Sequence, residues 1–271
     1  MSETFHIENL LRKDIKRNIS EVSEAFYFRP RYGVKGAAIQ VIDSLIELFS
    51  ETYQAKESRS KIEIKYSLFA DSSESDFSAN VQTSYEEFPV MQGDFFEAFP
   101  DLYMTLFASN DHTKGDPPIS PDAVYIHDHK NSDDIGEIEM HIYLPRNHND
   151  IFSYLEDKRL EIAGVLSHEM QHVVQKHIYN EVLSSTAGDD LLSHAFDINE
   201  IDARVEEAIT AMGDDTPVES KDEFIFSLER CLDDYLSRNV TDKDEVSVPK
   251  MKEKMMAEHL VIYENKLKGV L

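Results

Sequence analysis

Residues 160–178 have the sequence LEIAGVLSHEMQHVVQKHI, in which apolar positions recur every three to four residues and flank a His-Glu-x-x-His motif. This periodicity predicts a helix. On a helix, His168 and His172 lie four residues apart and project from one face, where they can bind one Zn²⁺. Glu169 lies beside them and can take a proton from a metal-bound water instead of ligating. The segment therefore predicts a metal site with hydrolytic chemistry.

The alternative interpretation of the motif is two solvated histidines on an amphipathic helix. Ala163, Gly164, Val165 and Leu166 precede the motif and give it an apolar approach. A solvent-exposed helix face could carry charged or amide side chains equally well at these positions. The two histidines therefore favour a buried helix that binds a metal.

The chain has an unusually acidic composition. Its 271 residues are enough to bury a sizeable core, and 27 basic against 53 acidic residues give a formal net charge of −26. Such a charge repels phosphate backbones and anionic membranes, so nucleic acid is not expected as a substrate. A basic protein or peptide is the partner that this charge favours.

Cysteine usage and hydropathy bear on the compartment. Cys231 is the single cysteine and cannot form an internal disulfide, which suits a reducing environment. Residues 1–11 do not have the pattern of a signal peptide, and no apolar stretch approaches the roughly 20 residues of a membrane span. We therefore expect a soluble protein in the cytoplasm, with no membrane partner.

Hydrophobic periodicity predicts one α+β domain over residues 1–271, with a helical N-terminal part (1–57), a sheet-bearing part (58–160) and a helical C-terminal part (161–271) that opens on the motif helix. Asn149 or Asp150 is expected to cap the approach to that helix. The expected helices cover residues 7–26, 34–53, 94–107 with a break at Pro100, 160–178, 199–212, 222–238 and 249–267. The expected strands cover residues 61–66, 80–90, 124–127 and 137–144, and residues 71–78 and 109–121 are expected to be loops.

A catalytic zinc usually has three protein ligands and one open position, so a third ligand is needed. Gln175 and Ile178 stand where the metzincin pattern requires glycine and histidine, which excludes that class. His177 lies about 140° around the helix from His172 and points away. Glu200 and Asp202, in the segment Asn-Glu-Ile-Asp-Ala-Arg of residues 199–204, are the acidic candidates, and only one of them can face the metal.

The order of a strand, an H-E-x-x-H helix and a helix opening with Asn-Glu-x-x-Ala resembles the zincin metallopeptidases that use a glutamate ligand, the gluzincins. It looks most like small peptidases encoded by tailed bacteriophages, and the Glu-x-Asp-Ala element is similar to that of ImmA/IrrE-type phage-associated proteases. The resemblance covers about residues 137–212. It implies a zincin-like fold, His168, His172 and Glu200 as zinc ligands, and Glu169 as general base. A phage origin would place the protein in the host cytoplasm or the virion.

The chain departs from the thermolysin-like pattern four residues after the ligand glutamate. Those enzymes have an aspartate there that orients a histidine, whereas this chain has Arg204. The sequence therefore does not identify the side chains that orient the two histidines.

Other histidines provide rival sites. His127 and His129, followed by Glu137 and His141, faintly resemble a cupin metal site, although the cupin glycines are missing and a solvent-facing strand is favoured. His194, between the motif and residue 200, could donate a hydrogen bond to an oxyanion, but an ordinary loop histidine is the simpler interpretation.

The sequence thus predicts a zinc metalloendopeptidase in which Glu169 activates a zinc-bound water, and the strand at residues 137–144 is expected to lie beside the cleft and pair with substrate. Two alternatives stay open: a zincin-fold binding or structural protein without turnover, and an acidic inhibitor that mimics nucleic acid. The substrate, its cleavage specificity and the oligomeric state are not predicted.

Overall fold

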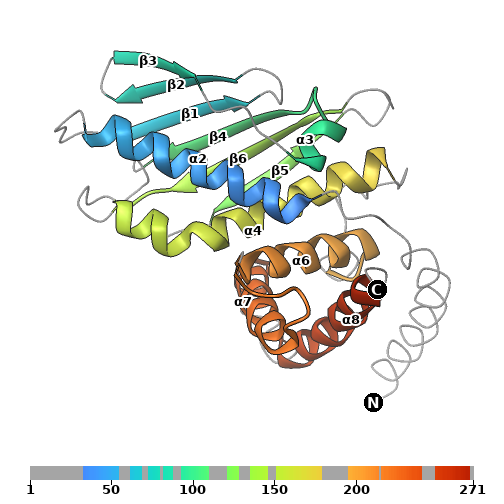
Figure 1. Ribbon diagram of the computed structural model, residues 1–271. Coiled ribbons are helices and arrows are strands. Elements are labelled where there is room, and N and C mark those ends of the chain that lie inside the picture. The colour runs from blue at the N-terminus through green and yellow to red at the C-terminus, as the bar shows by residue number, and fades with distance from the viewer. Residues whose placement is uncertain are drawn as a thin grey trace.

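The computed structural model is mixed α and β (Figure 1). It describes residues 33–54, 62–68, 73–79, 82–87, 93–109, 121–127, 135–145, 151–178, 195–213, 215–239 and 248–268. The helix predicted over residues 7–26, the predicted cap at residues 149 and 150, and His129 and His194 lie outside these residues. None of the described helices is long and apolar enough to cross a membrane.

Six strands form one mixed sheet in the order β3-β2-β1-β4-β6-β5. All neighbouring strands are antiparallel except β4 and β6, which are parallel. The strands are β1 (Ile62–Leu68), β2 (Ser73–Ala79), β3 (Gln82–Glu87), β4 (Tyr103–Ser109), β5 (Asp122–Ile126) and β6 (Glu137–Tyr143). The strand next to the motif helix is β5, at one end of the sheet.

The alternating pattern of β6 determines which face of this strand is buried. Ile138, Met140 and Ile142 are each at most 2% exposed, whereas the residues between them are partly exposed. This confirms the face predicted from the sequence. The predicted role of β6 in pairing with substrate is wrong, because its two edges are already paired with β4 and β5.

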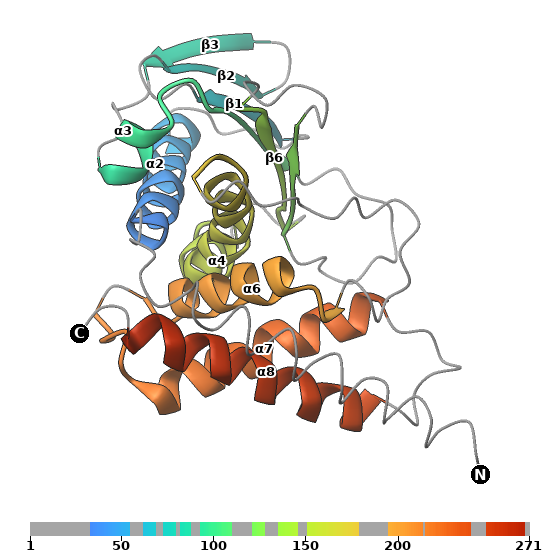
Figure 2. The same ribbon diagram turned by 90° about the vertical axis from the view of Figure 1, so that its right-hand side faces the viewer.

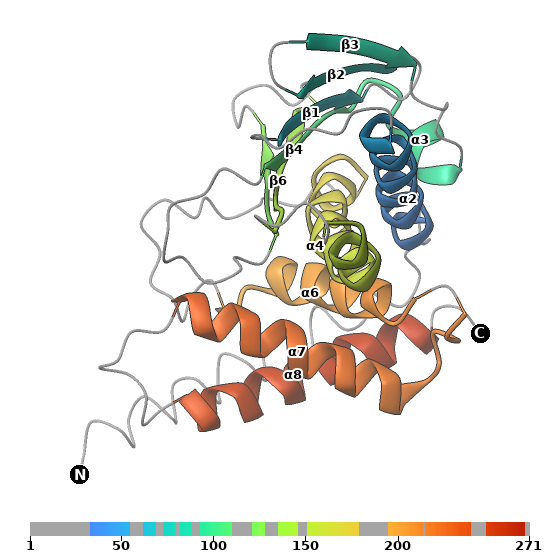
Figure 3. The ribbon, with the colours of Figure 1, turned by 90° about the vertical axis from the view of Figure 1, so that its left-hand side faces the viewer.

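Helices α2 (Val34–Gln54) and α4 (Ile151–His177) lie side by side over one face of the sheet (Figures 2 and 3). Ala38, Val41 and Ile42 of α2 are fully buried, as are Leu166 and Met170 of α4. The apolar faces of the two helices join the buried face of the sheet in one core. The motif helix α4 is therefore supported by packing along its length and begins nine residues before the expected start at residue 160.

Helices α6 (Ile198–Ala211), α7 (Lys221–Asn239) and α8 (Val248–Lys268) pack around a second apolar cluster on the other side of α4 (Figure 2). Phe224 of α7 stacks on Tyr263 of α8 with ring centroids 3.8 Å apart. The N-cap of α6 is Asp197, whose carboxylate accepts a hydrogen bond from the backbone N–H of Asn199. Helix α6 contacts α4, so the two clusters meet along the motif helix.

Two sequence predictions about the sheet are wrong. The helix expected over residues 94–107 ends as α3 (Asp94–Ala98), and the following residues form β4. Pro100 is incompatible with a continuing helix, and the residues after it pair with both β1 and β6. The loop expected at residues 71–78 contains β2, whose backbone pairs with β1 and β3 although five of its seven residues are Ser, Asp or Glu.

Candidate metal centre

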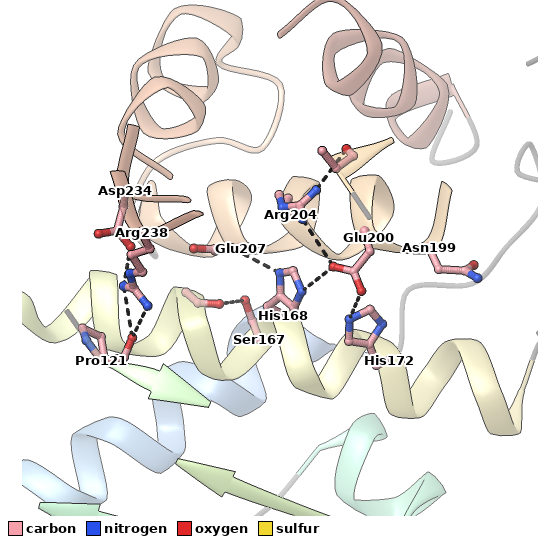
Figure 4. A network of polar contacts seen from close by, with 12 residues as sticks. Pro121, Ser167, His168, His172, Asn199, Glu200, Arg204, Glu207, Asp234 and Arg238 are labelled. Carbon is pink, nitrogen blue, oxygen red and sulfur yellow. Dashed lines mark hydrogen bonds and ion pairs between the residues drawn. The ribbon is translucent and has the colours of Figure 1, made fainter. Parts of the chain in front are cut away.

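Helix α4 places the two motif histidines side by side. The rings of His168 and His172 are edge to face, with centroids 4.9 Å apart. His172 is buried and His168 is half-buried. One helical turn separates the two residues, as the motif spacing predicts, and both rings project toward α6 (Figure 4).

Glu200, in the first turn of α6, faces both rings (Figure 4). One carboxylate oxygen lies 3.4 Å from Nε2 of His168, and the other lies 3.4 Å from Nε2 of His172. These separations are longer than ordinary hydrogen bonds, and they match the roughly 3.3 Å between two ligands of a tetrahedral Zn²⁺ with bonds near 2.0–2.1 Å. The donor atoms of the three residues all lie within 4.8 Å of one another, so the cluster could hold a metal ion.

The other ring nitrogens of the histidines are held by protein side chains. Nδ1 of His168 lies 3.2 Å from Oε2 of Glu207, and Nδ1 of His172 lies 2.7 Å from Oε1 of Gln175. Metal-binding histidines commonly bond a protein acceptor through the nitrogen that does not ligate. The arrangement therefore fixes both rings and leaves the two Nε2 atoms directed at Glu200.

Glu207 and Gln175 were missed by sequence reasoning. Glu207 is seven residues after Glu200, about two helical turns, so it lies on the same face of α6. Gln175 follows His172 by three residues on α4, and the sequence pattern identifies it only as a residue that excludes the metzincin class. Both spacings are visible in the sequence, but only the packing of α6 against α4 indicates which of the many polar side chains reach the rings.

Asp202 does not face the histidine cluster. Its Oδ2 accepts hydrogen bonds from the side-chain amides of Gln171, at 2.6 Å, and Gln175, at 2.9 Å. Its Oδ1 lies 3.0 Å from Nζ of Lys266 in α8. Of the two acidic candidates, Glu200 is therefore the one that α6 brings to the histidines. Asp202 instead accepts a hydrogen bond from Gln175, which in turn contacts His172.

Arg204 occupies the position at which thermolysin-like enzymes have an aspartate. Its guanidinium lies 3.5 Å from Oε2 of Glu200 and 4.1 Å from the centroid of the Tyr235 ring. The side chain is only 3% exposed. Arg204 thus balances the negative charge of Glu200 and orients no histidine, a role that Glu207 takes for His168.

Glu169 points toward the end strand of the sheet. Its Oε2 accepts a 2.8 Å hydrogen bond from the backbone N–H of Tyr125 in β5. Burial raises the pKa of Glu169 to about 7, the positive charge of His168 opposes this shift, and the negative charge of Glu200 adds to it. A carboxylate whose pKa lies near neutral pH can both accept and donate a proton.

The two histidines have opposite protonation tendencies without a metal. Burial disfavours the charged form of His168, but the carboxylates of Glu200 and Glu207 outweigh it and raise the pKa of His168 to about 10. Burial and the charge of His168 lower the pKa of His172 to about 4. The same ion pairs hold the pKa values of Glu200 and Glu207 below their usual range, although burial alone would raise them.

The remaining sequence candidates lie elsewhere. His177 contacts the hydroxyl of Tyr125 through Nε2 at 2.9 Å, away from the cluster, as predicted. His127 stacks on Tyr125, and His141 stacks on Phe107. Among the described residues, the His168, His172 and Glu200 group is the one cluster with metal-binding spacing, and the rival cupin-like arrangement does not assemble there.

A comparison of the chain with protein-family models, curated proteins and solved structures gives no match.

Proposed function

We propose that this protein is a zinc-dependent metallopeptidase of zincin-like fold, with His168, His172 and Glu200 as metal ligands and Glu169 as general base. The observation that carries the proposal is the convergence of two Nε2 atoms on one carboxylate, with each nitrogen 3.4 Å from a carboxylate oxygen, from two packed helices. Two nitrogens and one carboxylate are the ligand set of a catalytic zinc site, in which a fourth position holds water.

The zincin assignment draws support from the surroundings of the motif helix. The sheet ends in a strand, β5, that runs antiparallel to its neighbour and contacts α4. The third ligand comes from the next described helix, α6, as the gluzincin resemblance implies. The end strand rather than β6 is therefore the strand that we assign to substrate binding.

Strand β5 can align an extended peptide with the site. One edge pairs with β6, so the other edge of its backbone is directed toward α4 and the motif. A peptide that adds to this edge would receive main-chain hydrogen bonds and lie beside Glu169. The N–H of Tyr125 now bonds Glu169, and a substrate carbonyl can replace that carboxylate as acceptor.

Glu169 is placed to move the protons of peptide hydrolysis. A zinc ion held by the three ligands would polarise both a bound water and the substrate carbonyl. Glu169 accepts the proton of the water, and its pKa of about 7 allows it to pass that proton to the leaving amine. Burying this carboxylate is costly, and that cost favours an enzyme over a binding protein that needs only the three ligands.

The experiment compares wild type, Glu169→Gln and His168→Ala after loading with zinc. Wild type should cleave members of a peptide library at discrete bonds. Glu169→Gln should retain zinc but lose activity by about 10²–10⁴-fold, the usual contribution of a general base. His168→Ala should lose the metal together with the activity.

Cleavage is measured by mass spectrometry and bound zinc by elemental analysis. Equal cleavage by wild type and Glu169→Gln would assign the activity to another site or a contaminant. A fully zinc-loaded wild type that cuts nothing would instead favour a non-catalytic zincin-fold binding protein. Displacement of duplex DNA from a basic protein would favour the nucleic-acid-mimicking inhibitor.

A further inference from the structure

A cavity of about 500 Å³ lies between α4, α6 and α7, beside the histidine cluster. Asp157, Glu161 and Gly164 of α4 line it, and they precede His168 at intervals of four, three and four residues. These spacings place them on the face of α4 that carries the histidines. The cavity therefore lies on the face of α4 that carries the histidines, one helical turn before His168, although none of the three candidate ligands lines it.

Glu207 connects the cavity to the metal centre directly. Its carboxylate lines the cavity, and Oε2 lies 3.2 Å from Nδ1 of His168. Gly164 is four residues from His168, about 6 Å along the helix axis. If the cleaved peptide bond of a substrate lies at the metal, the side chain of a neighbouring substrate residue is long enough to span these 6 Å and enter the cavity. The volume is also within the range of ligand pockets, roughly 300–1,000 Å³.

The walls of the cavity contain a buried hydroxyl that can accept a hydrogen bond. Ser227 of α7 lines the cavity and is 6% exposed, and its hydroxyl has no hydrogen-bond partner among the described residues. Cys231 lies one turn further along α7, and burial raises the pKa of its thiol, which stays neutral. The cavity thus has an unused polar group and no thiolate.

The charges around the cavity favour a cation. Five acidic and three basic residues line it. Lys158 and Arg230 both pair with Glu161, at 2.6 and 3.1 Å, and Arg238 pairs with Asp234. Asp157 is exposed and has no ion-pair partner among the described residues. Asp233 pairs with Lys252 at 2.7 Å and Glu207 faces His168, so among the described residues Asp157 supplies the one uncompensated charge of the lining, and it is negative.

We propose that this cavity is a subsite for a lysine or arginine side chain that neighbours the cleaved bond of a peptide substrate. The proposal rests on the proposed peptidase function and assigns its substrate class. Asp157 attracts the cation at the opening, Ser227 accepts a hydrogen bond from it, and Glu207 supplies negative charge at the inner end beside His168.

The test begins with the zinc-loaded full chain and a proteome-derived peptide library cut after glutamate, so that lysine and arginine remain internal. Cleavage sites should be enriched in lysine or arginine at one position beside the cleaved bond. Two synthetic peptides based on the best sequence, with arginine or glutamate at that position, then give the ratio of kcat/KM values.

Asp157→Lys should lower the arginine-to-glutamate ratio roughly tenfold, because it replaces an attraction with a repulsion. Glu156→Lys is the matched control: it makes the same charge change at the neighbouring exposed residue, which does not line the cavity, and should leave the ratio within about twofold. A folding defect would lower both rates together and leave the ratio unchanged.

The outcomes separate this proposal from the proposed function. Cleavage without preference for basic residues would overturn the subsite and leave the peptidase standing. A preference that survives Asp157→Lys, or that Glu156→Lys weakens equally, would also overturn it. If the zinc-loaded wild type cleaves nothing, the peptidase proposal fails, and the subsite fails with it.

Discussion

At the scale of single residues, Glu200 and Asp202 have separate tasks although they lie two positions apart. Glu200 faces the two Nε2 atoms, and Asp202 bonds Gln171 and Gln175. Removing a residue that hydrogen-bonds a metal ligand typically lowers metal affinity tenfold to a hundredfold. Removing the ligand itself lowers metal affinity by more. The isosteric changes Glu200→Gln and Asp202→Asn distinguish the two tasks without leaving a cavity.

We expect Glu200→Gln to weaken zinc binding by more than about a hundredfold and Asp202→Asn by about tenfold. Competition with a chromophoric chelator measures both affinities against wild type. The reverse ranking would assign the third ligand to Asp202. Small and equal losses would show that neither carboxylate ligates.

The protonation of His168 predicts a pH dependence of metal binding. Its pKa of about 10 and the pKa of His172 near 4 mean that the metal-free site holds one imidazole proton at pH 8. The metal needs a neutral imidazole, so binding must release about one proton. Affinity should therefore rise with pH, by about tenfold per unit, until pH approaches the pKa of His168.

Calorimetric titration of zinc at pH 8, in two buffers that differ in ionisation enthalpy, measures the released protons. This pH lies above the pKa of Glu169, about 7, so that carboxylate contributes little. A binding enthalpy that is independent of the buffer would contradict the assignment of the proton to His168.

At the scale of elements, the site depends on how closely α4 and α6 approach. Gly164 lies at their contact, where an added Cβ would be 3.2 Å from the backbone carbonyl oxygen of Glu207. Relieving that contact requires α6 to shift, and α6 carries both Glu200 and Glu207. The packing of two helices thus sets the spacing of the three candidate ligands.

Gly164→Ala should therefore lower the free energy of unfolding by about 1–2 kcal/mol and weaken zinc binding, because overpacking displaces α6. Gly36→Ala in α2 is the matched control, since a Cβ there would meet no atom within 4 Å. It should stabilise the protein by about 0.5–1 kcal/mol through helix propensity. Thermal unfolding and zinc titration test both; a gain in stability from Gly164→Ala would disprove the close contact.

The elements also mark how far sequence alone could predict this fold. The long helices α2, α6, α7 and α8 and the strands β1 and β6 agree with their hydrophobic periods to within a few residues, because each buries one regular face. Strand β2 is rich in Ser and acidic residues and is held by pairing with β1 and β3, which no local pattern encodes. The edge position of β5 likewise depends on strand order.

Some residues of the candidate metal site could be predicted from the sequence, and others depend on the fold. The helical spacing of His168 and His172 was readable from local sequence, and the resemblance to gluzincins favoured Glu200 over Asp202. The partners of the two rings, Glu207 and Gln175, depend on the contact between α4 and α6, and only a three-dimensional arrangement identifies them.

At the scale of the whole molecule, the cluster joins two apolar cores. Helix α4 belongs to the core under the sheet, and α6 belongs to the helical core with α7 and α8. A metal bound to residues of both helices connects them, and any ligand that binds only the folded state stabilises it by mass action. The connection should therefore appear in thermal stability.

Free zinc at a hundred times its dissociation constant should stabilise the fold by about 2.7 kcal/mol, a rise in Tm of roughly 5–10 °C. Differential scanning calorimetry with and without a chelator measures the shift. His172→Ala removes a ligand and should abolish it. A shift of equal size in that variant would place the stabilising metal elsewhere.

Helix α8 is the last described helix to be translated, and it supplies a charge that supports the candidate metal site. Lys266 in α8 lies 3.0 Å from Asp202 and donates a hydrogen bond to Glu206, and Asp202 in turn holds the amide that positions His172. On the ribosome, the motif helix emerges long before Lys266 is translated. A nascent chain therefore carries these two buried carboxylates without their counter-charge, and the site gains its full support only late in translation. For the peptidase that we propose, this order of synthesis delays cleavage until the chain is nearly complete and so protects neighbouring nascent proteins.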